Sequence, residues 1–560
     1  MALNARYANG TVVRWPGLAG LPITTLTSVA VDGRGGEWWR PAGTPPRIWL
    51  GTPTGAILFD PAASQSADVW LADATPPARP VLQQRWRYFN GPRWLPVSAA
   101  NATFAAIPAG GIASVGNTTW VVTAGGGVAV LTAASWQLAD KAAWYEAVLP
   151  RHDRLGLVAD CTLSSFGNVT SCTNTPCESN GLWTGIQLAA EAARYAATGD
   201  PAALAATIHY GLGMQLLLNV TGAVGYPARS VVAPWEPAPA PGGWWFPSPD
   251  PAYAGWWYMS NTSSDSTTGH MYGYGMAAAL GGPAATAGVN TTALLLDILD
   301  RILAGNYTLI DPTGVPTRWG NWNPGTLNDN RDWSDGRGVN SMQMLAFAAA
   351  GAGLAVPGTP ASAAASAALT YLTAPGQDYG GNVLNAKIEV PTDDNFSDDE
   401  LTFLPYALFC AYAPAAAAAA PALPPAVAAS LQRTFAFVRA YRPALWSVMY
   451  LSCTAGGAPV NPTAAATDAW WNLATWPLEL IDWPIANSQR ADVRLNPEPN
   501  RNLQYGTQSA TVLPANERGQ YRWNADPYAL DTPGVGLDEY EPGAWLLPYW
   551  LARAAGLIAV

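Results

Sequence analysis

The chain has 560 residues, of which 49% are apolar and 12% are charged, and its formal net charge is −11. A chain of this length and apolar content folds into roughly two or three globular domains, which excludes a disordered protein. The negative charge argues against nucleic acid or an anionic membrane surface as a partner, because both are polyanions.

Residues 1–137 are predicted to form a β-rich segment, since short apolar runs alternate there with Gly, Pro and Asn. A weak repeat supports this prediction, because residues 47–52 and 55–59 have the same pattern as residues 119–123 and 126–130. Each copy is predicted as a strand, a glycine turn and a second strand, and the pattern resembles the propeller repeats of two-component regulators. We expect a partial propeller that packs on the next domain without closing a ring.

Cysteines and glycosylation sequons indicate a secretory history. Cys161, Cys172 and Cys177 cluster among Ser, Thr and Asn, which predicts a local disulfide with one cysteine left over. Cys410 and Cys453 are candidates for a second bridge, and zinc is not expected because the chain has three histidines and no CxxC. No leader is visible at the N-terminus, so we expect a secreted protein whose N-terminus is truncated or mis-assigned. The sequons stand at Asn9, Asn101, Asn117, Asn168, Asn219, Asn261, Asn290, Asn306 and Asn395.

From residue 138 onward the apolar period becomes helical, and residues 138–560 are predicted as one (α/α) toroid of about six helical hairpins. The fold class is therefore mainly α, with the toroid preceded by the partial propeller. Long loops join the helices, and loops at one end of the inner helices would surround a single cleft. The expected helices span 182–198, 203–217, 267–280, 292–303, 341–350, 361–372, 400–411, 426–440, 470–481 and 543–556.

Short motifs follow one another along this segment. They are RHDRLGL at 151–157, GLW at 181–183, GYPARS at 225–230, SSDSTTGH at 263–270, PTRWG at 316–320, NFSDDEL at 395–401 and PYW at 548–550. In this order they resemble a group of proteins of bacteria and algae that combine a propeller with an (α/α) toroid. The resemblance begins at about residue 86 and implies the architecture rather than a particular chemistry. The chain departs from the group in holding only part of the propeller.

The first polar loop of the predicted toroid holds Arg151, His152, Asp153 and Arg154. Two cations that flank an acid and an imidazole suit a carboxylate-binding site or a positioned general base. We therefore predict Asp153 as catalytic, and His152 and Arg154 as substrate-binding. The alternative is an ion-paired loop that closes the first helix.

Asp265 stands at the start of a predicted helix that also carries His270 and Tyr272. Asp265 is predicted as a catalytic acid or base, and a helix N-terminus favours its ionised form. His270 lies about a turn and a half further on, so it joins the predicted catalytic set. His270 and the substrate-binding Tyr272 would suit proton transfer in a lyase. The alternative is that Asp265 only caps the helix.

The most acidic run covers residues 393–400. Its alternating oxygen ligands resemble a calcium loop, but the sixth position is Asp398 rather than Gly, so at most a loose calcium site is expected and no other cofactor. Ser397 and Glu400 have the spacing of a capping box. This arrangement would leave Asp398 and Asp399 as catalytic carboxylates that face the cleft.

Aromatic and basic side chains complete the predicted binding surface. The chain has 27 tryptophans, and indole rings stack on the apolar faces of sugars, so Trp183 and Trp319 are predicted as substrate-binding. Arg229 and Arg318 are suitable partners for the carboxylate of a uronic acid.

We expect Asp153, Asp265, His270 and at least one of Asp398 and Asp399 to converge on one cleft. Two carboxylates that meet across a sugar cleave glycosidic bonds, so the predicted function is a glycoside hydrolase or polysaccharide lyase acting on an extracellular glycan, with uronic acids among the candidate sugars. No nucleotide-binding loop, GxSxG elbow or long apolar span is present in the sequence. A non-catalytic glycan-binding or matrix protein is the alternative, followed by a sensory ectodomain.

Overall fold

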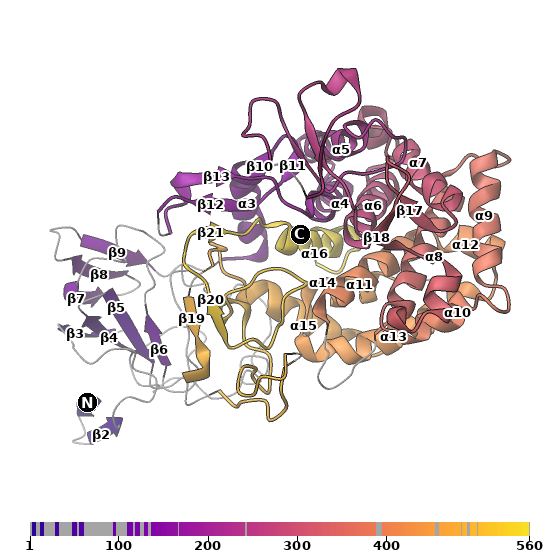
Figure 1. Ribbon diagram of the computed structural model, residues 1–560. Coiled ribbons are helices and arrows are strands. Elements are labelled where there is room, and N and C mark those ends of the chain that lie inside the picture. The colour runs from indigo at the N-terminus through magenta and orange to yellow at the C-terminus, as the bar shows by residue number, and fades with distance from the viewer. Residues whose placement is uncertain are drawn as a thin grey trace.

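The computed structural model describes residues 136–558 except 166, 241–242, 388–394, 454–458, 483, 490–492 and 501, and before residue 136 it describes strand backbones. Within these residues helices predominate, and the strands form small open sheets (Figure 1). The chain is therefore mainly α, as the sequence predicts.

The strands before residue 136 form antiparallel sheets. One sheet has the order β3-β4-β5-β6, another has the order β7-β8-β9, and β1 pairs with β2. Both copies of the predicted repeat are hairpins, since Thr52 pairs with Gly55 between β4 and β5, and Val122 pairs with Val128 between β8 and β9. These strands are β1 (Leu3–Arg6), β2 (Val12–Trp15), β3 (Ser28–Asp32), β4 (Arg47–Thr52), β5 (Gly55–Asp60), β6 (Arg93–Pro96), β7 (Ala109–Val115), β8 (Thr118–Thr123) and β9 (Val128–Thr132).

Local signals in the sequence set the limits of the helices. Gly199 ends α4 at a φ of +67°, a left-handed conformation that glycine adopts without steric cost. Asp200 then caps α5, because its Oδ1 accepts the N–H of Ala202, and Pro201 takes the first helical position. The helices are α3 (Leu138–Val148), α4 (Asn180–Thr198), α5 (Pro201–Asn219), α6 (Ser264–Gly288), α7 (Thr291–Ala304), α8 (Arg337–Leu354), α9 (Pro360–Leu372), α10 (Tyr379–Asn382), α11 (Phe396–Ala411), α12 (Ala413–Ala419), α13 (Leu423–Val438), α14 (Ala444–Ser452), α15 (Pro462–Thr475) and α16 (Gly543–Ala554).

Short strands lie in the loops between these helices. They are β10 (Asp153–Arg154), β11 (Leu157–Val158), β12 (Cys161–Leu163), β13 (Cys172–Asn174), β14 (Ser230–Val232), β15 (Trp245–Pro247), β16 (Trp257–Met259), β17 (Thr308–Ile310), β18 (Pro316–Asn321), β19 (Pro484–Ala486), β20 (Asp531–Pro533) and β21 (Asp538–Glu539). The three-stranded sheet β13-β12-β21 joins the loop before α4 to the loop before α16. Loops far apart in the sequence are thereby held together.

The helices contact one another in a closed circuit. α4 contacts α6, α6 contacts α8 and α11, α8 contacts α11, α11 contacts α14, α14 contacts α16, and α16 returns to α4. α5 packs on α4 and α6, α7 on α6 and α8, and α15 on α14. All of α16 from Gly543 to Ala552 is buried, whereas α7 and α9 each bury one side. We call α4, α6, α8, α11, α14 and α16 the inner helices.

The closest of these contacts joins α4 and α6. A Cβ atom added to Gly185 would lie 2.1 Å from the carbonyl oxygen of Gly269, and one added to Gly269 would lie 2.4 Å from that of Gly181. The two backbones therefore touch, and only glycine fits at the crossing.

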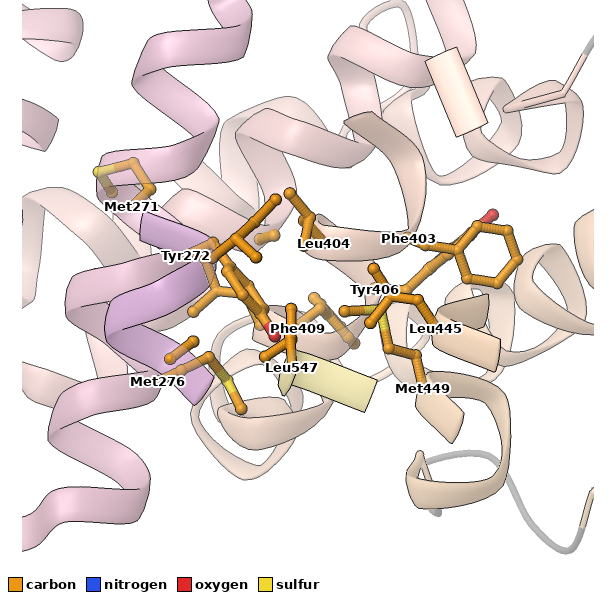
Figure 2. Close-up of a cluster of buried hydrophobic side chains, with 14 of the residues drawn as sticks. Met271, Tyr272, Met276, Phe403, Leu404, Tyr406, Phe409, Leu445, Met449 and Leu547 are labelled. Carbon is orange, nitrogen blue, oxygen red and sulfur yellow. The ribbon is translucent and has the colours of Figure 1, made fainter. Parts of the chain in front are cut away.

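Apolar side chains fill the space between the inner helices (Figure 2). Tyr272 from α6, Leu404 from α11, Leu445 from α14 and Leu547 from α16 are all fully buried in one large hydrophobic cluster. Burial of this kind is the main stabilising contribution to the helical part of the chain.

Both predicted disulfides are confirmed. Cys161 pairs with Cys172 across the β12–β13 hairpin, with their Cα atoms 5.1 Å apart, and leaves Cys177 as a free thiol. Cys410 at the end of α11 pairs with Cys453 after α14 at a Cα separation of 5.5 Å. These bridges fit an oxidising, extracellular setting.

Among the described residues, no single helix has the length and apolar character to cross a membrane. The pair Phe396–Ala411 and Ala413–Ala419 passes that test by composition, but it is bent by 78°. Most of α11 is buried against other helices.

Candidate functional site

Four carboxyl groups that interact electrostatically lie at or near the starts of inner helices. Asp265 lies in the first turn of α6, Asp398 lies in the first turn of α11, and Glu400 follows two residues later. Glu541 lies two residues before α16. Glu400 interacts electrostatically with both Asp265 and Glu541, and Asp398 interacts with Asp265. We call Asp265, Asp398, Glu400 and Glu541 the acidic centre.

Glu400 is the most enclosed member of the acidic centre. Its side chain is fully buried, and neither carboxyl oxygen has a hydrogen-bond partner among the described residues. Burial, followed by the negative charge of Asp265, raises the pKa of Glu400 to about 8. Glu400 therefore holds a proton at neutral pH.

The predicted capping box of Ser397 and Glu400 is wrong. Helix α11 begins at Phe396 with Asn395 as its N-cap residue, so the third helical position belongs to Asp398. Glu400 lies beyond the reach of a capping box and turns inward instead.

Burial also raises the pKa of the other three carboxyls. The pKa of Glu541 rises to about 7, although Arg522 opposes the rise, and its Oε2 accepts the N–H of Gly543 at 2.5 Å. The pKa of Asp398 rises to about 6, with burial as the first cause and Lys387 as the opposing charge. Burial raises the pKa of Asp265 against the pull of Arg229. Asp265 and Asp398 are partly exposed, so they form the accessible side of the centre.

The cations beside the acidic centre are each bound to another acid. The Arg522 guanidinium is paired with Asp160. Arg229 lies 3.5 Å from a carboxylate oxygen of Glu178. The third cation, Lys387, pairs with Asp399 at 2.9 Å. Asp399, which was predicted as catalytic, therefore lies in a buried ion pair. Within the part of the chain that the structure describes, the members of the acidic centre have no ion-pair partner of their own.

Aromatic rings lie against Arg522, which interacts with the acidic centre. The guanidinium of Arg522 stacks 4.1 Å from the ring centre of Trp183, at the start of α4, and 5.6 Å from that of Tyr540. Arg522 also interacts with Glu400 and Glu541. Of the predicted binding residues, Trp183 and Arg229 therefore lie beside the acidic centre.

Asp153 is engaged elsewhere. Its Oδ2 lies 2.5 Å from Nε2 of His209 on α5, and its Oδ1 accepts the N–H of Gly156. This arrangement is the one expected if residues 151–154 form an ion-paired loop rather than a catalytic site.

His152 and Arg154 are also bound within the loops. The buried ring of His152 lies 3.5 Å from Glu539, which accepts two hydrogen bonds from Arg151. Arg154 donates to Glu236 through its Nε at 2.8 Å. These contacts tie the loops before α4, α6 and α16 together.

His270 and Tyr272 lie in the interior. His270 donates from Nδ1 to the carbonyl of Ser266 at 2.8 Å and packs against Gly181 of α4, and burial lowers its pKa to about 4. Tyr272 points into the apolar cluster (Figure 2), where burial raises its pKa. Both residues are one or two turns deeper than Asp265 on the same helix.

Arg318 and Trp319 form an exposed aromatic site in the loop before α8. The Arg318 guanidinium lies 4.5 Å from the ring centre of Trp319, which is 46% exposed. The ring centre of Trp333 lies 6.1 Å from that of Trp319. Because this loop leads to the N-terminus of α8, it belongs to the same end of the inner helices as the acidic centre.

The described residues contain one group with metal-ligand spacing, which is His152, Cys161 and Glu539. The sulfur of Cys161 is in a disulfide, so it offers no thiolate. Asp393 and Asp394, the first residues of the calcium-loop pattern, lie outside the described residues.

Sequence reasoning missed Glu400 and Glu541 as site residues, together with Arg522 and Asp160. The available signal was a carboxyl inside an apolar run, since Glu400 precedes LTFLPYALF and Glu541 precedes PGAWLLPYW. A charged residue in such a run is either neutralised or paired when it is buried.

Comparisons with protein-family models, with curated proteins and with solved structures found no match to this chain.

Proposed function

We propose that this chain is a carbohydrate-active enzyme that cleaves glycosidic bonds by acid–base catalysis within an (α/α) toroid. The closed circuit of inner helices, with outer helices packed on it, supports a toroid of helical hairpins. The antiparallel sheets before residue 136 support a partial propeller. The observation that carries the function is the acidic centre, where carboxyls with raised pKa values meet at one end of the inner helices.

Asp398 and Asp265 are the catalytic pair in this proposal. A general acid must hold its proton until it reaches the leaving oxygen, and Asp398, with a pKa of about 6, keeps a proton longer than an ordinary aspartate. Asp265 faces Arg229, which favours its ionised form, so it acts as the base or nucleophile. Glu400 and Glu541 are more deeply buried than this pair, and they add to the negative potential around it whenever they are ionised.

Aromatic side chains supply the contacts to sugar. Tyr540 is partly exposed beside Arg522, and Trp319 lies exposed in the loop before α8, whereas Trp183 is buried beneath Arg522. Indole and phenol rings offer flat apolar faces of the size of a pyranose ring.

A non-catalytic glycan-binding protein is the second candidate. Trp235 and Trp244 are 71% and 53% exposed in the loop between α5 and α6, and the ring of Trp235 contacts that of Trp256 at 5.5 Å. Exposed tryptophans of this kind bind sugars without any acid–base chemistry.

We place the protein outside the cell. The two disulfides need an oxidising compartment, and the sequon asparagines Asn219, Asn290 and Asn306 are exposed.

The test is an activity screen of neutral, amino-sugar and uronic-acid polysaccharides. Products are measured both as new reducing ends and as the absorbance of unsaturated sugars. The wild type should cleave one class, and Asp265→Asn should lower kcat at least about 100-fold without lowering the melting temperature. The matched control is Asp300→Asn on the exposed side of α7, which should keep full activity. Equal rates for wild type and Asp265→Asn would exclude Asp265 from the reaction, and binding without cleavage would favour the second candidate.

A further inference from the structure

We propose that the acidic centre binds a positively charged sugar, so that the glycan recognised here carries free amino groups, as in a polymer of 2-amino-2-deoxy sugars. This inference rests on the proposed function, because it names the class of glycan that the same site takes.

The charge balance of the site is the first argument. Its cations are already matched, since Arg522 pairs with Asp160, and Lys387 pairs with Asp399. Arg229 is likewise held by Glu178. Among the described residues no cation forms an ion pair with the four carboxyls, and the negative charge of Asp265 opposes ionisation of both Asp398 and Glu400.

Glu400 provides the second, independent argument. Its two oxygens are fully buried and accept no hydrogen bond from a described residue, although buried carboxyl oxygens are normally satisfied. Glu400 interacts electrostatically with Asp265, Glu541 and Arg522. An ammonium group that enters from the accessible side, at Asp265 and Asp398, would supply the missing donors and positive charge.

The same balance disfavours a uronic acid at this position. A sugar carboxylate would meet four carboxyls, and the two guanidiniums beside them are already engaged, since Arg229 is paired with Glu178 and Arg522 with Asp160. The apolar face of an amino sugar can still use the partly exposed ring of Tyr540, where its ammonium group would gain a cation–π contact.

Binding of a cation should also release protons. A positive charge beside Glu400 and Glu541 lowers their pKa values from about 8 and about 7, so both carboxyls ionise as the ligand enters at neutral pH. A neutral sugar has no such effect.

The experiment is isothermal titration calorimetry at pH 7 in two buffers of different ionisation enthalpy. The probes are tetramers of glucosamine, of N-acetylglucosamine and of a uronic acid. We expect the free-amine tetramer to bind at least about tenfold more tightly than the N-acetylated one, to release protons, and to weaken with added salt. Glu400→Gln should remove most of this preference and most of the proton release. If Glu400→Gln fails to fold, Asp398→Asn is measured in its place, and it should weaken the preference for the free amine. The control Asp300→Asn should behave as wild type.

Equal affinity for the acetylated and free-amine tetramers, tighter binding of the uronic acid, or no binding of the free amine would each overturn the inference. The inference would also be overturned if calcium binds to the centre while the free-amine tetramer binds no more tightly than the other sugars. That result would assign the centre to a metal ion. Cleavage of a neutral glycan without amine preference would leave the proposed function standing and this inference wrong. Selective amine binding without cleavage would leave the inference standing and the enzymatic function wrong.

Discussion

Glu400 illustrates how position decides the chemistry of a carboxyl group. From the sequence it looks like a capping residue, yet in the fold it is fully buried, and its pKa rises to about 8. The sequence could predict Asp265 and Asp398 because polar residues stood out at helix starts. It could not predict which acids would be enclosed, because that depends on how helices distant in the chain pack.

Glu400 should make the protein less stable as pH rises. Its pKa is about 8 in the folded state and about 4.5 in the unfolded chain, so the folded state binds the additional proton between these values. Stability is therefore lost as pH increases from about 5 to about 8. Glu400→Gln should remove part of this loss and raise the unfolding free energy at pH 8 by about 1–3 kcal/mol relative to wild type. Urea unfolding at pH 5 and pH 8 measures the change, and an equal pH dependence in both proteins would refute the assigned pKa.

At the scale of elements, the sequence predicted helices best where apolar residues recur with a helical period. The expected helix at 182–198 corresponds to α4 (Asn180–Thr198), and the one at 361–372 corresponds to α9 (Pro360–Leu372). The predicted helix at 470–481 was wrong in its limits, because α15 ends at Thr475, just before Trp476 and Pro477. Helix α14 was missed, since its sequence ALWSVMYLS is too short and too uniformly apolar to show a period.

The crossing of α4 and α6 should tolerate no side chain at Gly185. A Cβ atom there would overlap the carbonyl of Gly269, and both backbones would have to move apart. Gly185→Ala should lower the unfolding free energy by about 2–4 kcal/mol, as overpacked core substitutions do. Gly380→Ala is the matched control, because its Cβ would meet open space in α10, and it should change stability by less than about 1 kcal/mol. Thermal unfolding of both variants compares them, and equal melting temperatures would contradict the close crossing.

The bridge between Cys410 and Cys453 should stabilise the contact of α11 with α14. It closes a loop across a sequence separation of 43 residues, so its loss should cost about 2–4 kcal/mol. Cys453→Ser measured under oxidising conditions tests this value. Cys177→Ser removes the free thiol and should leave stability unchanged. If Cys177→Ser lowered stability and Cys453→Ser did not, the pairing of Cys410 with Cys453 and the free state of Cys177 would both be contradicted.

At the scale of the whole molecule, the closed circuit of inner helices brings distant residues together. Of the residues expected to converge, Asp265 and Asp398 interact electrostatically, and each lies in the first turn of an inner helix. Asp153 pairs with His209 on α5, and His270 lies deeper in the interior. Residues at helix starts thus interact with one another, whereas Asp153 is held by a partner on α5 that was not visible in the sequence.

The most direct test of the central claim is the pH dependence of kcat/KM for wild type and Asp398→Asn on the glycan that the screen identifies. The account predicts that wild-type activity falls above about pH 6, as Asp398 loses its proton, and falls at low pH as Asp265 gains one. Asp398→Asn should reduce cleavage of the glycan about 100-fold or more, but should cleave a nitrophenyl glycoside of the same sugar nearly as fast as wild type, because that leaving group needs no acid. An unchanged pH profile in Asp398→Asn, or equal losses on both substrates, would contradict the claim that Asp398 is the general acid of the acidic centre.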